Sequence, residues 1–429
     1  MHGSGSQARV GGADGFTPRA GLLLSSGMRS LLPLGLLFLI TGCIARGPGV
    51  AAAQYAAPPT GDYAVDLPLE RSHWIVAEAS IAGRTVRLVV DTGAANSLLS
   101  PALARSLALP QVGTVPVVDF ENRRKQLPVV TAGLTLGGAL FRDVGFVVAD
   151  TTELSAAACQ PIDGLLGQNV LYQTTYEIDI HGLRLRLASG PEQLPPREGG
   201  QQLRLAPPSY LAHLRAPARG LMPRFMTIDT GSPYALTAED AVMRVLPIAD
   251  SVRAPTMMSG LHGKARVREE TLFAWPDVPV GGLDLRGVDA KGGRGSTTLG
   301  LQVLDSYVVR VDPRRFTLQL WPTGAPLPRG HAVLGLGFDV ADKSWSVTRV
   351  VPRSPAERAG LAIGDVVLAI DGVALADMSA QDRCLLGRDF AARPQVRLTV
   401  VHAGQSREVE LVRAPIFQVA ALAGPPLPA

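Results

Sequence analysis

The feature of this 429-residue sequence that most constrains its fold is a repeated Asp-Thr-Gly triplet. The first triplet is Asp91-Thr92-Gly93, and the second, 138 residues later, is Asp229-Thr230-Gly231. Each follows an apolar run and precedes small and polar residues, which predicts a buried strand ending in a tight turn. A single triplet would be weak evidence, but two in matching contexts indicate a paired site.

The chemistry of paired carboxylates explains the composition of the triplets. Two carboxylates within a few ångströms of one another cannot both ionise, so Asp91 and Asp229 would share one proton. The ionised member can take a proton from water, while the protonated member hydrogen-bonds a carbonyl oxygen. We expect the Thr hydroxyls to bond across to the partner loop, and the Gly residues to allow close approach of backbone.

The surroundings of the triplets repeat as well. A hydrophobic-Gly segment follows each triplet, with Leu166-Gly167 in the first half and Leu299-Gly300 in the second. The Gly lies 76 residues after Asp91 in the first half and 71 residues after Asp229 in the second. An alternating strand pair then follows in each half, so the sequence predicts an internal duplication.

Each half also contains a candidate hairpin between its triplet and its hydrophobic-Gly segment. In the second half, residues 258–264 include Gly260, His262 and Gly263, which suit a mobile flap over a cleft. Residues 117–124 of the first half contain no Gly and match less well. We interpret His262 as a solvated residue at a hairpin tip rather than as a ligand.

With both triplets and both Leu-Gly pairs in place, residues 72–321 resemble the aspartic proteases, and the bacterial retropepsin-like members most closely. The resemblance implies a mainly all-β fold of two barrel halves, each giving one Asp to a shared cleft under a flap. Most retropepsins assemble from two identical chains, whereas this chain carries both halves in tandem, as pepsins do. It lacks an obvious flap Tyr.

The resemblance also assigns roles to individual residues. Asp91 and Asp229 would be the catalytic pair of an aspartic endopeptidase that uses neither a metal nor an organic cofactor. Asp163, Asp179 and Asp312 are read as structural, because Asp near strand ends commonly binds backbone N–H groups. The residues expected to support the active loops are Thr92, Gly93, Leu166, Gly167, Thr230, Gly231, Leu299 and Gly300.

A second resemblance covers residues 331–415. The run Gly335-Leu336-Gly337-Phe338, with Gly364-Asp365 further on, resembles a PDZ domain, a β-sandwich with one or two short helices. Such a Gly-rich loop presents backbone N–H groups to a peptide carboxylate, and the following strand edge pairs with the peptide. Residues 379–386 would form the groove helix. The alternative is a module that only packs on the protease.

The N-terminal region reads as a targeting segment. Met28-Arg29 supplies a charge, residues 31–40 an apolar core, and Cys43 follows a small residue, as in a bacterial lipobox. We therefore expect residues 1–43 to consist of an extension, added by a start site assigned too far upstream, and a signal peptide that starts at Met28. Acylated Cys43 would anchor the protein, and Ile44 favours the outer membrane, facing the periplasm. A cleaved signal peptide or an anchor helix is the alternative.

Composition and the positions of Pro/Gly-rich segments complete the prediction. The net charge is only +4 and no basic block carries interleaved aromatics, so nucleic-acid binding is unsupported. The seven His show no metal-ligand spacing. Cys159 and Cys384 are expected to be free, partly buried thiols, with a disulfide as the alternative.

The predicted segments are a flexible tether 44–71, protease halves 72–190 and 205–322, linkers 191–204 and 323–330, a PDZ domain 331–415 and a tail 416–429.

Two rival interpretations remain. The first is a non-catalytic envelope protein that uses the protease fold to hold peptides, with the PDZ domain as adaptor. The second is an enzyme that acts only as a dimer of chains, instead of a monomer whose halves pair with one another. The intact triplets favour the catalytic interpretation.

Overall fold

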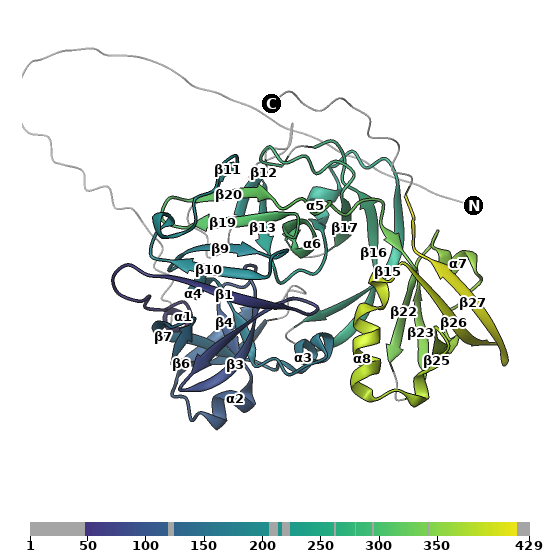
Figure 1. Ribbon diagram of the computed structural model, residues 1–429, viewed down its shortest axis with the longest axis horizontal. Coiled ribbons are helices and arrows are strands. Elements are labelled where there is room, and N and C mark those ends of the chain that lie inside the picture. Colours follow the sequence, from purple (N-terminus) through teal and green to yellow (C-terminus); the bar gives the residue numbers. More distant parts are fainter. Residues whose placement is uncertain are drawn as a thin grey trace, which may run out of the picture. The chain divides into compact units, whose positions relative to one another are not determined.

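The computed structural model describes residues 48–118, 124–205, 213–216, 224–260, 263–278, 280–293, 296–340 and 343–417. As predicted, the described chain is mainly β, with two lobes followed by a smaller β-rich C-terminal domain (Figure 1).

The first lobe contains a closed barrel. Its strands follow the order β2-β3-β8-β4-β7-β6, and β2 also pairs with β6 to close the ring. Alternate residues of these strands, such as Val144 and Phe146, point into the core, as the period of two requires. The elements are α1 (Pro48–Ala53), β1 (Ala64–Arg71), β2 (Ile75–Ile81), β3 (Arg84–Val90), β4 (Ser97–Leu99), α2 (Pro101–Ser106), β5 (Gln111–Val118), β6 (Arg124–Leu136), β7 (Ala139–Val148), α3 (Thr152–Ala158), β8 (Gly164–Leu166), α4 (Gln168–Leu171), β9 (Thr175–Asp179) and β10 (Arg184–Ala188).

The expected flexible tether 44–71 is wrong from residue 48 onward. Helix α1 packs its Ala53 against Val115, Val129 and Val147 of the first lobe, and β1 pairs with both β10 and β2. The Pro and Gly residues that suggested a linker do not prevent this packing. Glycine at position 145 of β7 allows α1 to lie close to the sheet, because a Cβ atom there would lie 1.8 Å from the Ala52 carbonyl oxygen.

The second lobe repeats the strand order of the first. Its sheet runs β12-β13-β18-β14-β17-β16-β15, where the first lobe has β2-β3-β8-β4-β7-β6-β5. The fold therefore bears out the internal duplication. The elements are η1 (Pro191–Gln193), β11 (Gln201–Arg204), β12 (His213–Ala216), β13 (Arg224–Asp229), β14 (Leu236–Glu239), α5 (Asp240–Met243), β15 (Ser251–Gly260), β16 (Gly263–Ala274), β17 (Asp289–Gly293), β18 (Thr298–Gly300), α6 (Leu301–Leu304), β19 (Tyr307–Asp312) and β20 (Thr317–Pro322).

The two lobes share one sheet of the order β11-β20-β19-β9-β10-β1. At its centre β9 pairs antiparallel with β19, with Ile178 opposite Val309. The fully buried Glu177 of β9 binds Arg310 of β19 at 2.6 Å, which places an ion pair across this seam. Residues 201–204, expected in a linker, form β11 and belong to the sheet.

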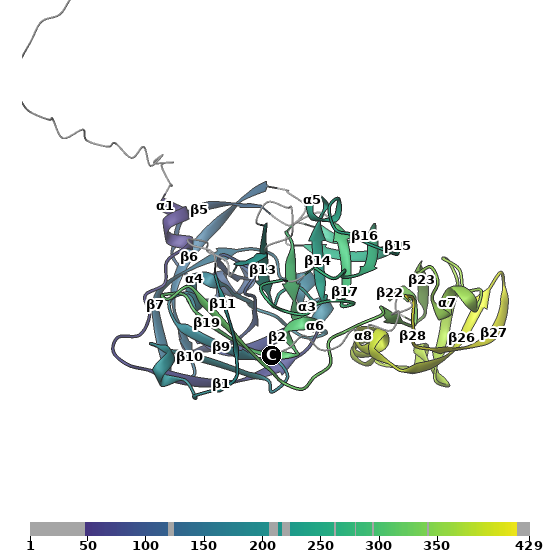
Figure 2. The ribbon, with the colours of Figure 1, turned by 90° about the horizontal axis from the view of Figure 1, so that it is seen from above.

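The C-terminal domain is a sheet of the order β22-β23-β24-β26-β27, packed around Trp345 and Leu398. Strand β22 is the edge of this sheet, and helix α8 lies beside it in both views (Figures 1 and 2). The elements are β21 (Ala332–Val333), β22 (Leu336–Val340), β23 (Trp345–Val350), α7 (Pro355–Arg358), β24 (Val366–Ile370), β25 (Val373–Ala374), η2 (Leu375–Asp377), α8 (Ala380–Asp389), η3 (Phe390–Ala392), β26 (Gln395–His402), β27 (Gln405–Val412) and β28 (Ala414–Pro415).

Two cysteines expected to be free thiols are joined instead. Cys159, directly after α3, and Cys384, on α8, form a disulfide across 225 residues of sequence. The Gln381 side chain also donates to the Cys159 carbonyl oxygen at 2.8 Å. Sequence reasoning failed here because the two residues lie in different domains, and only the fold brings them together. Likewise Ile416 and Phe417, expected in the tail, are buried against β15.

Candidate active site

The two Asp-Thr-Gly triplets lie at the ends of equivalent strands. Asp91 follows β3, which runs parallel to β8 with Val90 opposite Leu166. Asp229 ends β13, which runs parallel to β18 and places Asp229 opposite Gly300. The predicted association of each triplet with its hydrophobic-Gly segment is therefore present in both lobes.

The Thr residues of the triplets bind the two loops together reciprocally. The Thr92 hydroxyl donates to the Ile228 carbonyl oxygen at 2.7 Å and accepts from the Thr230 amide at 3.0 Å. The Thr230 hydroxyl donates to the Val90 carbonyl oxygen at 2.6 Å and accepts from the Thr92 amide at 3.1 Å. Both side chains are buried, so each of these four hydrogen bonds is shielded from water.

The Gly residues of the triplets lie against the opposite carboxylates. A Cβ atom at Gly93 would lie 2.3 Å from Asp229 Oδ1, and one at Gly231 would lie 2.5 Å from Asp91 Oδ1. No side chain fits at either position, so the close approach of the loops requires glycine. This apposition places the two carboxyl groups in one site built from both lobes.

Burial and mutual repulsion set the acidity of the pair. The Gly93 amide donates to Asp91 Oδ1 at 2.9 Å, and the amides of Gly231 and Ser232 donate to Asp229 Oδ1 at 2.9 and 3.1 Å. These bonds favour the ionised forms, but burial outweighs them and raises the pKa of Asp91 above its ordinary value. Burial and the nearby charge of Asp91 raise the pKa of Asp229 as well. The pair therefore retains a proton at a higher pH than an isolated Asp.

The Leu-Gly pairs bring backbone against the loops that follow the Asp-Thr-Gly triplets. Gly167 precedes α4 and Gly300 precedes α6, with nearly identical extended conformations. A Cβ atom at Gly167 would lie 2.6 Å from the Asn96 carbonyl carbon, and one at Gly300 would lie 2.3 Å from the Tyr234 carbonyl oxygen. These glycines support the loops by close packing, which agrees with the predicted position of the segment.

Several residues that support the site were not found by sequence reasoning. The Trp74 indole N–H donates to the Gly231 carbonyl oxygen at 2.8 Å, which links the first lobe to the second Asp-Thr-Gly loop. The Gln168 amide donates to the Thr92 carbonyl oxygen at 2.9 Å. Gln168 follows the Leu-Gly pair directly, so its proximity was readable in principle, whereas no local signal marks Trp74.

The hairpin candidates occupy equivalent places in the two lobes. Strands β15 and β16 form a hairpin in which Gly260 pairs with Gly263. Its tip, with His262, lies outside the described residues, so the interpretation of His262 remains a prediction. In the first lobe β5 and β6 form the corresponding hairpin, and residues 119–123 at its tip also lie outside the described chain.

The remaining acidic residues have the structural roles expected of them. Asp163 accepts from the Arg87 amide at 2.9 Å, and Asp179 accepts from the Gly182 amide at 2.7 Å. Asp312 accepts from the amides of Arg314 and Arg315 at 3.0 and 3.2 Å. Asp179 and Asp312 each cap a local turn, whereas Asp163 ties its loop to β3.

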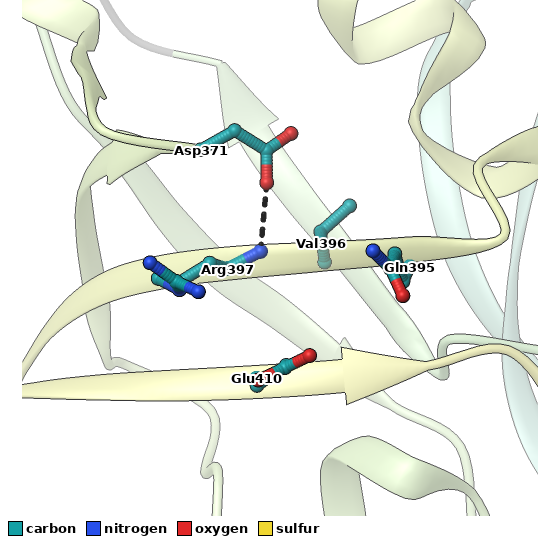
Figure 3. A pocket seen from close by; sticks show the side chains of 5 residues that line it. All are labelled: Asp371, Gln395, Val396, Arg397 and Glu410. Atoms are coloured by element: carbon teal, nitrogen blue, oxygen red, sulfur yellow. Dashed lines mark hydrogen bonds between the residues drawn. The ribbon is translucent and has the colours of Figure 1, made fainter.

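The Gly-rich loop of the C-terminal domain precedes an edge strand, as a peptide-binding loop requires. Gly335 has a φ of +97°, which favours glycine, and Leu336, Gly337 and Phe338 begin the edge strand β22. A polar pocket of this domain lies elsewhere, at strands β26 and β27 (Figure 3). Its Asp371 accepts from the Arg397 backbone amide at 2.8 Å, so this carboxylate holds the turn after β24 against β26.

Within the part of the chain that the structure describes, no group of His, Cys, Asp or Glu side chains is arranged to hold a metal ion. No helix in those same ranges is long and apolar enough to cross a membrane. Cys43, the predicted lipidation site, lies outside the described residues.

Comparison with known families supports the two resemblances. Residues 77–170 match the family described as Aspartyl protease, a segment that includes Asp91, Leu166 and Gly167. Residues 346–401 match the family described as PDZ domain. No curated protein matches the chain. Residues 77–170 are therefore similar to an aspartyl protease domain and residues 346–401 to a PDZ domain, and Asp229 lies outside the matched segments.

Proposed function

We propose that this protein is an envelope-associated aspartic endopeptidase that cleaves peptide bonds with Asp91 and Asp229. One observation carries the proposal: the two triplets form a single, reciprocally hydrogen-bonded site in one chain. The proposal extends the family resemblance of the first lobe to the second lobe, whose triplet has the same strand context.

The proposed reaction follows from the shared proton. The ionised carboxylate takes a proton from a water molecule as the water oxygen attacks the peptide carbonyl carbon, while the protonated carboxyl hydrogen-bonds the carbonyl oxygen. A proton then passes from the carboxyl pair to the amide nitrogen, and the C–N bond breaks to give an acid and an amine. The raised pKa of each Asp favours the required state, in which the pair holds one proton.

The fixed geometry of the loops supports this role. The hydrogen bonds of Thr92 and Thr230 leave the loops little freedom to rearrange during the reaction, so the carboxylates are held before substrate arrives. Because both carboxylates come from one chain, the proposal also favours a monomer with two pseudo-equivalent lobes over a dimer of chains.

The C-terminal domain is proposed to bind a peptide or protein terminus. Its edge strand β22 can pair with an extended peptide, and Gly335 to Phe338 can present amides to a carboxylate. Whether that peptide is a substrate or a regulator is a separate question, answered by cleavage assays with competing C-terminal peptides.

The proposed location is the periplasmic face of a bacterial outer membrane, with a lipid anchor on Cys43. The Cys159–Cys384 disulfide supports an oxidising compartment, where such bonds form and persist. Metabolic labelling with an alkyne fatty acid tests the anchor. Label on the wild type and none on Cys43→Ser is expected, whereas equal label on both would contradict it.

The decisive experiment is cleavage of a peptide library by the purified full-length chain between acid and neutral pH. Asp91→Asn and Asp229→Asn, which preserve side-chain shape, should each reduce the rate at least about 100-fold, because each removes one member of the acid–base pair. Asp179→Asn, which alters a turn-capping carboxylate, serves as the control and should remain active.

The outcomes separate the interpretations. Cleavage that survives either active-site variant would exclude a shared pair. Folded wild type that binds peptides but cleaves none of them would favour the non-catalytic peptide-binding protein.

A further inference from the structure

The C-terminal domain is attached to both lobes, and each wall of its expected peptide groove is attached to a different lobe. The walls of the groove are the edge strand β22 and the helix α8. Helix α8 lies against α3 of the first lobe, whereas β23, the partner of β22, lies against β15 of the second lobe (Figure 1). A peptide between the two walls would therefore bridge elements that are held by different lobes.

Helix α8 is fixed to the first lobe by one of its faces. Gln381, Cys384 and Arg388 follow one another at intervals of three and four residues, so they share that face. Cys384 forms the disulfide with Cys159, and the Gln381 side chain donates to the Cys159 carbonyl oxygen at 2.8 Å. Arg388 Nη1 lies 3.5 Å from the Ala158 carbonyl oxygen. Helix α8 therefore moves together with α3.

The strand wall is fixed to the second lobe instead. The His331 amide, which precedes the Gly-rich loop, donates to the Asp289 carboxylate of β17 at 2.8 Å. Directly after β23, Val351 packs in a cluster that contains Val252 and Ala254 of β15. The segments on either side of β22 and β23 are thus anchored on β15 and β17. Each wall of the groove is therefore held by its own lobe.

Contacts from the helix wall lead to the loop that carries Asp229. Burial lowers the pKa of His73, and the nearby charge of Arg388 lowers it further, which places the guanidinium close to this imidazole. The His73 ring packs edge-on against Trp74, with the ring centres 4.6 Å apart. The Trp74 indole N–H in turn donates to the Gly231 carbonyl oxygen. Helix α8 is therefore linked through two aromatic rings to the second Asp-Thr-Gly loop.

Contacts from the strand wall lead to the same loop through Arg349 of β23. Its guanidinium covers Gly337 of β22, where a Cβ atom would lie 2.1 Å from Arg349 Nε. Burial lowers the pKa of Arg349, and the nearby Tyr234 hydroxyl group partly offsets this lowering. Tyr234 lies five residues after Asp229. Arg349 is therefore adjacent both to the groove strand and to the loop that follows Asp229.

The groove and the Asp-Thr-Gly site therefore depend on the same relative position of the lobes. A peptide in the groove has to hold β22 and α8 at one separation, and with them the two lobes. A substrate lies between the same lobes, because its site is built from both of them. Once one ligand has immobilised the lobes, the second loses less conformational entropy on binding. The two binding free energies should therefore be coupled, and the coupling should be reciprocal.

We propose that a peptide in the groove between β22 and α8 strengthens substrate binding in the site of Asp91 and Asp229, and that the Cys159–Cys384 disulfide is required for this coupling. The inference rests on the proposed function of both sites and adds their regulation. The chain would act preferentially where a suitable free C-terminus is present.

The test measures the affinity for one ligand with the other absent or present. The substrate probe is a peptide with a non-cleavable hydroxyethylene group in place of the scissile bond. The groove probe is a peptide with a free C-terminal carboxylate and an apolar last residue, to suit Leu336, Phe338 and Leu386 of the groove walls. Each probe is the tightest binder of its kind in a library screened against the full-length chain.

A saturating amount of the groove probe should lower the dissociation constant of the substrate probe about five-fold. By reciprocity, the substrate probe should lower the dissociation constant of the groove probe by the same factor. The groove probe with a C-terminal amide in place of the carboxylate should have no effect on substrate binding.

Two variants test the two attachments separately. Cys159→Ser with Cys384→Ser releases α8 from its bond to the first lobe and should bring the five-fold ratio to about one. Arg349→Met keeps an apolar stem over Gly337, removes the charge near Tyr234, and should reduce the ratio as well. Because each variant is judged by a ratio, a changed affinity for either probe alone does not affect the result.

Arg393→Gln provides the matched control, because the ion pair of Arg393 with Asp371 lies within the C-terminal domain and reaches neither lobe. This variant should retain the five-fold ratio. A ratio of about one in the wild type would overturn the inference, and so would a five-fold ratio that persists when both cysteines are replaced. A chain that binds no peptide through a free C-terminus would overturn it too.

Neither probe is cleaved, so the two proposals can fail separately. A five-fold ratio in a protein that cleaves no peptide would reject the hydrolytic function and retain the coupling. Cleavage of peptides together with a ratio of about one would retain the function and reject the coupling.

Discussion

The two lobes hold their Asp-Thr-Gly loops in the same way but pack the strands beside those loops differently. Around Asp91 and Asp229 the hydrogen bonds are reciprocal, and even the conformations of Gly167 and Gly300 agree closely. On these strands and their neighbours, the in-register residues of the first lobe are apolar and buried, whereas those at the equivalent places of the second lobe are mainly polar. They are Val89, Leu165, Leu98, Val147 and Val129 in the first lobe, and Thr227, Thr298, Thr237, Lys291 and Leu272 in the second. A duplicated fold thus keeps the geometry that both carboxylates need, while the faces beside them diverge.

The largest expected effect comes from breaking the buried ion pair of the second lobe. Lys291→Met leaves Glu270 buried beside Thr256 without its cation, which should lower the free energy of unfolding by about 3–5 kcal/mol. The double variant Lys291→Val with Glu270→Leu imports the residue types of the first lobe and should recover most of this loss. Chemical denaturation measures both variants, and a double variant as unstable as the single one would contradict the expectation.

The disulfide tests whether helix α3 depends on the C-terminal domain. Replacing both cysteines, as Cys159→Ser with Cys384→Ser, should cost about 2–5 kcal/mol of stability, because the bond closes a long loop in the unfolded chain. Protease susceptibility around α3 should rise, whereas residues 294–297 of the second lobe should be unaffected. Limited proteolysis with mass spectrometry distinguishes these regions, and uniform susceptibility would contradict a local role.

The reciprocal hydrogen bonds of the Thr residues predict symmetric effects. Thr92→Val and Thr230→Val each leave a buried amide and a buried carbonyl oxygen unpaired, at a cost of about 3 kcal/mol. The two losses should be equal within error, and serine at either position should restore most of the stability. Thermal unfolding measures this, and a large difference between the variants would break the symmetry of the loops.

The smallest expected effect concerns pH. The folded-state pKa of both Asp91 and Asp229 is raised, so ionisation opposes folding, and wild-type stability falls as pH rises from the unfolded value near 4 through the folded values. Asp229→Asn removes this penalty and should unfold at a higher temperature than wild type at neutral pH. Below about pH 3, where both proteins are neutral at this position, the difference should vanish. A destabilised variant at neutral pH would contradict the raised pKa.

The sequence predicted the features that depend on short local motifs. The triplets, the Leu-Gly segments and the turn-capping roles of Asp179 and Asp312 were readable, because each requires a particular residue at a particular turn. The Asp163 carboxylate binds the amide of Arg87, which is remote in sequence, so its partner was not readable. The tether was predicted wrongly at residues 48–53 and 64–71, which form α1 and β1, because Pro and Gly nearby indicate a loop but do not show what the intervening residues pack against. The Cys159–Cys384 bond and the role of Trp74 were missed because their partners are remote in sequence.

By itself, the sequence determined the duplicated β fold, the two loops that carry Asp91 and Asp229, and the Gly-rich loop of the C-terminal domain. Their signals are periodic or local, and they survive without knowledge of long-range contacts. Only the tertiary structure decided which strands lie in register, and hence that Val89 begins an apolar row while Thr227 begins a polar one. A row across a sheet joins residues from five separate strands, so no segment of the chain contains it.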